Sequence, residues 1–214
     1  MNPFAKLKAD LAPMTFRQKL DHLWTYYKWV LALVIGLAVL LNIVVTALIS
    51  ANTEILLSGI AVNAPVDEAG YTALSSGYHA RLGGTKGQEV QFLQESLDRE
   101  ALHGGSEAAY SAIVKISGLA SLEMLDYLIL DADALEYYNE GDLFLDLRSL
   151  FTEEELSHMP VTSLGGVPMV IDITESAFVS AHIHGSGPYY LAFVYSTPHP
   201  EGCRALYQYL LTNQ

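Results

Sequence analysis

Residues 125–138 read LDYLILDADALEYY, and this stretch indicates the class of the fold. The apolar run Tyr127–Asp131 is typical of a buried β-strand. A helix is expected to follow at once, because Asp133 can cap it and Glu136 stands three residues later, which is the spacing of a capping box. Gly141 is expected to end this helix. The stretch therefore predicts a strand that leads directly into a helix.

The same alternation of strands and helices continues on both sides of this stretch. Further short apolar runs predict strands at 55–62, 89–93, 167–172 and 190–195. Caps and helical spacing predict helices at 67–82 and 106–122, a short helix behind the capping box of Thr152 and Glu155, and a last amphipathic helix from Pro200. Uniformly apolar strands that alternate with helices are typical of parallel sheets. We therefore predict an α/β domain with a mostly parallel sheet and helices on both faces.

An apolar segment precedes this domain. Residues 29–50 read WVLALVIGLAVLLNIVVTALIS and contain no charged side chain. A helix of this length, at about 1.5 Å per residue, is long enough for a bilayer core of about 30 Å. The apolar part of a cleaved signal peptide is shorter, about 7–15 residues. We therefore expect an uncleaved transmembrane helix and keep a signal peptide as the alternative.

The charges on either side of this segment predict its orientation. Residues 1–28 carry five basic and two acidic side chains, and the next basic residue after the apolar segment is Arg81. Positive charges stay in the cytoplasm, so we predict a cytoplasmic basic segment at 1–28, a span at 29–50 and an extracytoplasmic domain at 51–214, anchored in the plasma membrane. Residues 16–27 are expected to form either an amphipathic helix in the headgroup region or an extension of the span.

The outer domain is strongly acidic. Residues 54–214 carry six basic and 22 acidic side chains, a formal charge of −16. Nucleic acids bind through basic side chains that displace counterions, which excludes nucleic acid as an expected partner. The single cysteine, Cys203, excludes an intramolecular disulfide. It falls within the last amphipathic helix, where a buried and inert thiol is expected.

Two segments carry a resemblance to known proteins. The head MTFRQKL at 14–20 and WTYYKW at 24–29, followed by a span and an α/β domain, resembles uncharacterised single-pass membrane proteins of Gram-positive bacteria. The segment 125–147 is similar to part of the bilobal solute-binding proteins of ABC importers, in which a strand ends in Asp and a short helix and a turn follow. The chain after Leu147 is too short for a complete second lobe. The resemblance therefore implies a reduced, periplasmic-binding-protein-like domain.

Polar residues at the predicted strand ends are the candidate ligand site. Open α/β sheets bind ligands outside the carboxyl ends of their strands. Carboxylates there can bind a cation or act as acid and base, and the alternative is that they cap helices. The candidate residues are Asn63, Asp131, Asp133, Asp172 and Thr174.

His182 and His184 are a weak candidate for a metal site. Two histidines separated by one residue point the same way if they lie on a strand. With His199, Cys203 or Asp172 beside them they could bind a divalent metal. The alternative is a polar loop before Gly185. No metal or other cofactor is therefore expected.

These observations favour a binding protein over an enzyme. The sequence contains no Gly-x-Ser-x-Gly motif, and Gly83 to Gly87 lacks the spacing of a phosphate-binding loop. We therefore expect a non-enzymatic, membrane-anchored extracytoplasmic domain that binds a small ligand or a partner protein near the membrane. A structural or assembly subunit of a membrane protein complex is the alternative. A metal-dependent hydrolase built on the histidine pair is a third hypothesis.

Overall fold

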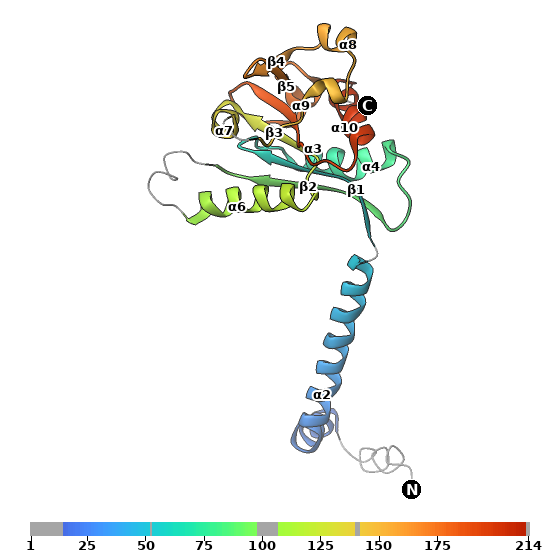
Figure 1. Ribbon diagram of the computed structural model, residues 1–214. Coiled ribbons are helices and arrows are strands. Elements are labelled where there is room, and N and C mark those ends of the chain that lie inside the picture. The colour runs from blue at the N-terminus through green and yellow to red at the C-terminus, as the bar shows by residue number, and fades with distance from the viewer. Residues whose placement is uncertain (1–14, 52, 98–106, 140–141, 213–214) are drawn as a thin grey trace. The chain divides into compact units, whose positions relative to one another are not determined.

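The computed structural model describes residues 15–51, 53–97, 107–139 and 142–212 (Figure 1). Contacts between Cα atoms divide the chain into two compact units, residues 1–52 and residues 53–214. The first unit contains helix α2 (Phe16–Ala51), and the second contains a six-stranded sheet with helices packed on it. The α/β class that the sequence predicts is confirmed. The predicted helix end at Gly141 lies outside the described residues.

Helix α2 is a single continuous helix with an exposed apolar surface. It begins at Phe16 and continues without a break through the predicted span, as expected if residues 16–27 extend that span. The described side chains of its apolar part are exposed, Trp29 and Leu33 among them. By length and composition the segment Lys28–Thr46 can cross a membrane. A signal sequence shares both properties, so these features fit either a single span or a signal.

The sheet is mixed. Its strands are β1 (Glu54–Val62), β2 (Gln88–Glu95), β3 (Tyr127–Asp131), β4 (Val161–Leu164), β5 (Val167–Asp172) and β6 (Tyr189–Phe193), in the spatial order β2-β1-β3-β6-β5-β4. The strand β1 pairs in parallel with β2 and with β3. The pairs β3–β6, β5–β6 and β4–β5 are antiparallel. Parallel pairing is thus confined to the half of the sheet formed by β1, β2 and β3.

The prediction of a mostly parallel sheet is therefore wrong for the other half. The strand β4 was not predicted, and only Gly165 and Gly166 separate it from β5. Both glycines have positive φ, 59° and 84°, which is the backbone of a two-residue hairpin turn. A parallel pair needs a crossover of a dozen or more residues, so this connection makes β4 and β5 antiparallel. The strand β6 then lies between β3 and β5 and runs opposite to both.

Helices cover both faces of the sheet (Figure 1). In chain order they are α3 (Glu68–Thr72), the π-helical turn η1 (Ala73–Gly77), α4 (Tyr78–Arg81), α6 (Glu107–Ser121), α7 (Ala132–Tyr138), the 3₁₀ turn η2 (Leu147–Ser149), α8 (Glu153–Ser157), α9 (Ala177–His182) and α10 (Pro200–Thr212). Residues of α6 and α7 pack in one core cluster, and residues of α4, α9 and α10 pack in the other.

The strand residues alternate between these two core clusters. In β3, Tyr127 and Ile129 face the cluster of α9 and α10, and Leu128 and Leu130 face the cluster of α6 and α7. Both faces of β3 are therefore buried, which is why the strand is apolar from Tyr127 to Leu130.

Two predicted caps have different outcomes. The capping box of Thr152 and Glu155 at the start of α8 is confirmed, since both of its reciprocal hydrogen bonds are present. The predicted cap of α7 is wrong, because Asp131 and not Asp133 accepts the hydrogen bond from the Ala134 amide, at 2.8 Å. The helix therefore begins at Ala132, and Asp133 lies exposed in its first turn.

A glycine allows the central strands to pack. Gly59 of β1 pairs with Tyr127 of β3, and the Tyr127 ring lies directly over it. A Cβ atom at position 59 would stand 2.0 Å from the ring carbon Cζ. The Tyr127 ring is completely buried and has no free space into which it could move. Position 59 therefore accepts only glycine.

We predict that Gly59→Ala lowers the free energy of unfolding by about 3 kcal/mol, because the added methyl group overlaps the Tyr127 ring. The control is Gly118→Ala in α6, where a Cβ atom meets nothing within 4 Å and the better helix propensity of alanine should stabilise the helix slightly. Urea unfolding of the full chain in detergent, followed by tyrosine near-ultraviolet circular dichroism, measures both variants. Equal stability of the two variants would contradict this account of the β1–β3 contact.

Candidate functional site

The predicted strand-end residues lie at the carboxyl ends of β1, β3 and β5, and two of them meet. Asn63, which has a φ of 54°, donates through Nδ2 to Asp131 Oδ1 at 3.2 Å and to the Leu97 carbonyl at 2.9 Å. The Leu97 amide donates in return to Asn63 Oδ1 at 2.7 Å. Asn63 thus joins the ends of β1 and β3 to the segment that follows β2. The same Asp131 oxygen also caps α7.

The other three candidates do not join this pair. Asp172 accepts from the Thr174 amide at 2.9 Å, and Thr174 Oγ1 accepts from the Tyr189 amide at 2.9 Å. These bonds close the turn after β5, and β6 separates that turn from Asp131. Asp133 is exposed on α7. Ligand binding at this edge of the sheet stays a prediction.

The histidine pair converges on an aspartate. His182 Nδ1 lies 3.2 Å from Asp67 Oδ1, and His184 Nε2 lies 3.3 Å from Asp67 Oδ2. Asp67 also caps α3 by accepting from the Gly70 amide at 2.6 Å. This backbone hydrogen bond, followed by the bonds to the histidines, lowers the pKa of Asp67 below its ordinary value. The two histidines do not lie on one strand, which was the condition for the metal hypothesis, because His182 ends the short helix α9.

The proposed third ligands are elsewhere. His199 and Cys203 lie near Asp126, which precedes the amino end of β3. The histidine pair lies at the opposite edge of the sheet, because Ile183 bridges to Val66, which follows the carboxyl end of β1. Within the described ranges, no group of three or more His, Cys, Asp or Glu side chains could hold a metal ion. The pair therefore connects α9 to α3 through Asp67.

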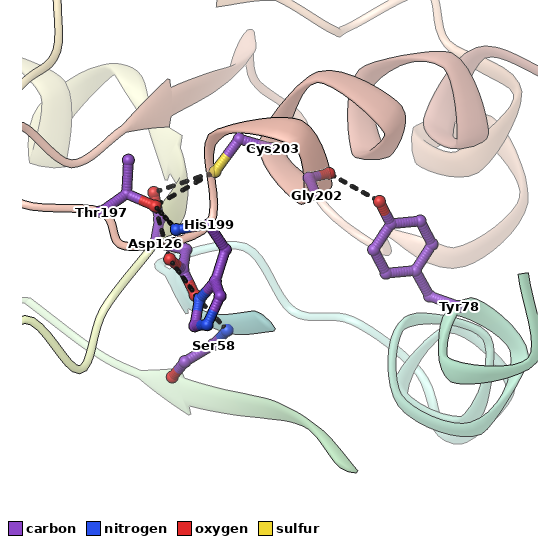
Figure 2. A network of polar contacts seen from close by, with 7 residues as sticks. All are labelled: Ser58, Tyr78, Asp126, Thr197, His199, Gly202 and Cys203. Atoms are coloured by element: carbon purple, nitrogen blue, oxygen red, sulfur yellow. Dashed lines mark hydrogen bonds and ion pairs between the residues drawn. The ribbon is translucent and has the colours of Figure 1, made fainter. Parts of the chain in front are cut away.

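A buried carboxyl group organises the opposite edge of the sheet (Figure 2). Asp126 is 1% exposed. It accepts from the Ser58 amide at 2.7 Å and from Thr197 Oγ1 at 2.5 Å, and His199 Nδ1 lies 3.1 Å from both of its oxygens. The backbone of Asp126 also pairs with Ser58 and with Val194. One side chain therefore connects β1, the start of β3 and the segment that leads into α10.

The Asp126–His199 pair has the geometry of an acid that orients a histidine, as in hydrolases. The thiol nearby does not complete such a site. Cys203 Sγ lies 3.5 Å from Thr197 Oγ1 and 3.8 Å from the Asp126 carbonyl oxygen, on the side of the carboxyl group. Burial raises the pKa of Cys203 to about 12, so the thiol stays protonated near neutral pH. As the sequence predicts, Cys203 is buried in the last helix.

One hollow among the described residues is an open groove of about 880 Å³ on the face of α6 and α7. Ligand pockets have volumes of about 300–1,000 Å³. A second hollow, of about 310 Å³ beside β2, is at the lower end of that range. The groove is lined by Ile113, Ser117, Ala120 and Ser121 of α6, Tyr137 and Tyr138 of α7, the segment Asp142, Leu143 and Phe144, and Tyr195 after β6. It contains none of the residues predicted from the sequence.

The groove has an apolar floor and aromatic walls. Ala120, Tyr138 and Phe144 are buried, whereas Tyr137 is 38% and Tyr195 is 55% exposed. The rings of Tyr137 and Tyr138 meet edge to face, with centroids 5.0 Å apart and planes at 88°. Large exposed rings over a buried floor are typical of a surface that receives a ligand.

The Tyr138 hydroxyl is a polar atom without a partner at this floor. The side chain is 6% exposed, and its oxygen is buried with no hydrogen bond to any described residue. Burial raises the pKa of Tyr138 above its ordinary value, so the hydroxyl stays protonated. A buried hydroxyl that lacks a partner costs about 1–3 kcal/mol. The oxygen is not accessible from the groove in this structure, so a ligand would recover this free energy only after a side-chain movement uncovers it.

The buried network of Asp126 positions one wall of the groove. The two residues after Tyr195 each donate a side-chain hydrogen bond. Ser196 Oγ donates to the Ala120 carbonyl at 2.6 Å, and Thr197 Oγ1 donates to Asp126. The Tyr195 amide donates to the Leu143 carbonyl at 3.0 Å. The backbone on both sides of Tyr195 is therefore fixed, while its ring is exposed to solvent.

Sequence reasoning missed this groove for a specific reason. Tyr137 and Tyr138 belong to the predicted helix, and Tyr195 ends the predicted strand 190–195, so all three are explained there by the core. Only the fold brings Tyr195 next to α6 and α7. The signal available in the sequence is the pair of adjacent tyrosines at the end of a helix, which point in different directions around the helix axis.

Comparisons with known proteins identify no relative: no protein-family model, no curated protein and no solved structure matches the chain.

We predict that Asp126→Ala lowers the free energy of unfolding by about 3–5 kcal/mol, because the buried partners of the carboxyl group lose their acceptor. Asp126→Asn keeps one acceptor oxygen and should cost less. The control is Asp133→Ala, which removes an exposed carboxylate and should change stability by less than about 0.5 kcal/mol. Urea unfolding of the full chain measures all three. A loss below about 1 kcal/mol for Asp126→Ala would show that the network does not hold the strands.

Proposed function

We propose that this protein is a membrane-anchored extracytoplasmic binding domain that captures a small ligand in the groove between α6 and α7. The observation that carries the proposal is the groove itself, which has aromatic walls and a buried, unpartnered Tyr138 hydroxyl at its floor. The hydroxyl supports the proposal less than the groove does, because His79 Nε2 and the core hydroxyl of Tyr127 are also buried without a partner among the described residues.

The anchor in this proposal is α2, as an uncleaved single span with the N-terminus in the cytoplasm of a bacterial cell. The exposed apolar surface of the helix supports a membrane environment. The excess of basic residues before the helix, and the formal charge of −16 on residues 54–214, support an orientation with the α/β domain outside the plasma membrane.

The proposal excludes catalysis as the main activity. Cys203 is buried with a raised pKa, and the bonds of its sulfur go to Thr197 and to a backbone carbonyl. His182 and His184 both contact the Asp67 carboxylate, which caps α3. These contacts support a structural role for the side chains from which a hydrolase would have to be built.

The resemblance of residues 125–147 to the solute-binding proteins of ABC importers belongs to the same proposal. It supports a solute as the ligand. The site proposed here differs from the strand-end site that the sequence predicts, because the groove lies on the face covered by α6 and α7, where Tyr138 and Phe144 pack.

A partner protein is the second candidate, and the surface of α6 favours it. Val114 is 70% exposed, Leu122 is 68% exposed and Tyr110 is 53% exposed. Exposed apolar side chains gathered on one element mark many protein interfaces. In this case the protein would act as a structural or assembly subunit, and crosslinking in membranes from positions 110 and 114 would identify the partner.

We predict that a membrane-impermeant maleimide labels Ser186→Cys in intact cells and labels Ala5→Cys only after lysis. Ser186 lies in an exposed loop of the outer domain, and Ala5 lies in the basic head. The wild-type chain is the control, because its single thiol is fully buried. Labelling of both variants or of neither before lysis would contradict the orientation. Release of the Ser186→Cys protein into the medium would indicate a cleaved signal.

We predict that Ser117→Trp abolishes ligand-induced thermal stabilisation, because the indole fills the groove beside Tyr137 and Tyr195. A ligand at about 100 times its dissociation constant adds about 2.7 kcal/mol, a rise of about 5–10 °C for a domain of this size. The measurement is a thermal-shift panel of amines, amino acids, sugars and peptides on the full chain in detergent.

Ser180→Trp is the matched control, since Ser180 is an exposed serine on α9, which packs on the other face of the sheet. This variant should keep every thermal shift of the wild type. If instead Ser117→Trp keeps the shift while Asn63→Ala and Asp172→Ala lose it, the ligand binds at the strand ends and the groove is not the site.

A further inference from the structure

The charge around the groove restricts its ligand. Among the described residues that line it, Asp142 is the only one with a charged side chain, and it is exposed. The nearest basic residue on α6, Lys115, is paired with Glu95 of β2 at 2.6 Å. The whole outer domain carries a formal charge of −16, which attracts cations and repels anions. An anionic ligand would therefore meet no positive partner among the lining residues.

The aromatic walls match a positive charge. The faces of tyrosine rings are negative, and a cation within about 6 Å of a ring centroid is attracted to them. Tyr137 and Tyr195 present exposed rings at the groove, and Tyr138 packs edge to face on Tyr137. Three tyrosines and one carboxylate at a single groove are the components of an aromatic site for an ammonium group.

The floor of the groove adds two requirements. Ile113, Ala120, Leu143 and Phe144 are apolar, so they favour a ligand with an apolar body. The Tyr138 oxygen has no hydrogen-bond partner among the described residues and accepts from an N–H group if a side-chain movement uncovers it. A protonated primary amine has such N–H groups, whereas a quaternary ammonium ion has none.

We propose that the groove binds a protonated amine attached to an apolar body, with the ammonium group between Asp142 and the tyrosine rings and the apolar body against Phe144 and Leu143. This inference rests on the proposed function, because it names the ligand class of the same groove. It goes beyond that function by excluding anionic ligands and by ranking neutral ligands below cations of the same shape.

The test compares three probes of nearly equal shape: phenethylamine, neutral 2-phenylethanol and anionic phenylacetate. Isothermal titration calorimetry is carried out on the full chain in nanodiscs of zwitterionic lipid, and empty nanodiscs give the background. We expect phenethylamine to bind with a dissociation constant of about 1 mM or below, given its nine heavy atoms. We expect 2-phenylethanol to bind at least about tenfold more weakly, and phenylacetate not to bind measurably.

Two groove variants test the assignment of the residues. Asp142→Asn and Tyr195→Ala should each weaken phenethylamine binding by about two- to fivefold. Asp142→Asn should leave 2-phenylethanol binding unchanged within about twofold. The matched controls are Glu175→Gln and Tyr71→Ala, an exposed carboxylate and an exposed tyrosine away from the groove. Both controls should bind phenethylamine as the wild type does.

The outcomes separate this inference from the proposed function. Equal binding of all three probes, lost in Ser117→Trp, would overturn the amine class and leave a binding groove. Preference for phenylacetate would overturn it as well. Phenethylamine binding that survives in Ser117→Trp and in Tyr195→Ala would place the amine elsewhere and contradict both proposals. If none of the probes binds at a probe concentration of 10 times the expected dissociation constant, the proposed amine class is overturned.

Discussion

The outer domain depends on one buried carboxyl group. Asp126 is almost completely inaccessible to solvent, and its oxygens accept from the Ser58 amide and the Thr197 hydroxyl and contact the His199 ring. A buried carboxyl group is costly unless it is fully hydrogen-bonded, so these partners have to meet at one point. That requirement aligns β1 with β3 and brings the start of α10 against both, although the three segments are far apart in the sequence.

The groove is a consequence of the same alignment. Thr197 holds the turn after β6, and this turn carries Tyr195 to the end of α6, where Ser196 bonds to the Ala120 carbonyl. On the other side, Asp131 starts α7 directly at the end of β3, so that the Tyr138 ring reaches the floor of the groove. The aromatic wall at Tyr195 is thus fixed by hydrogen bonds behind it, while its exposed ring is available for contacts with a ligand. A rigid backbone with exposed rings reduces the entropy lost on binding.

Local patterns in the sequence predict the elements of this fold well. The strand 127–131 is apolar at its first four positions because both of its faces are buried there, and the capping box at Thr152 depends on residues three apart. The error in the cap of α7 is of two residues, because Asp131 and Asp133 are both suitable caps and the helix begins directly at the end of the strand, at Ala132. The hairpin of β4 and β5 was missed although Gly165 and Gly166 form a typical two-residue turn, since the segment 161–164 is short and half polar.

The site could not be predicted in the same way, because its residues come from four separate segments. Strand order decides that Tyr195 lies beside α6, and strand order follows from which apolar surfaces pack together rather than from any local pattern. The strand-end residues were predictable as a group, since the carboxyl ends of β1 and β3 share one edge. Their hydrogen bonds to Leu97 and Ala134 show that two of them, Asn63 and Asp131, also connect the backbone.

Hydrogen exchange of the full chain in nanodiscs, with and without phenethylamine, tests the central claim most directly. If the ligand binds in the groove, the amides at the end of α6, in α7 and from Asp142 to Phe144 should exchange more slowly in its presence, and those of residues 63–67 and 172–184 should not change. Slower exchange at residues 63–67 and 172–184, with α6 and α7 unaffected, would contradict the account and place the site at the carboxyl ends of the strands.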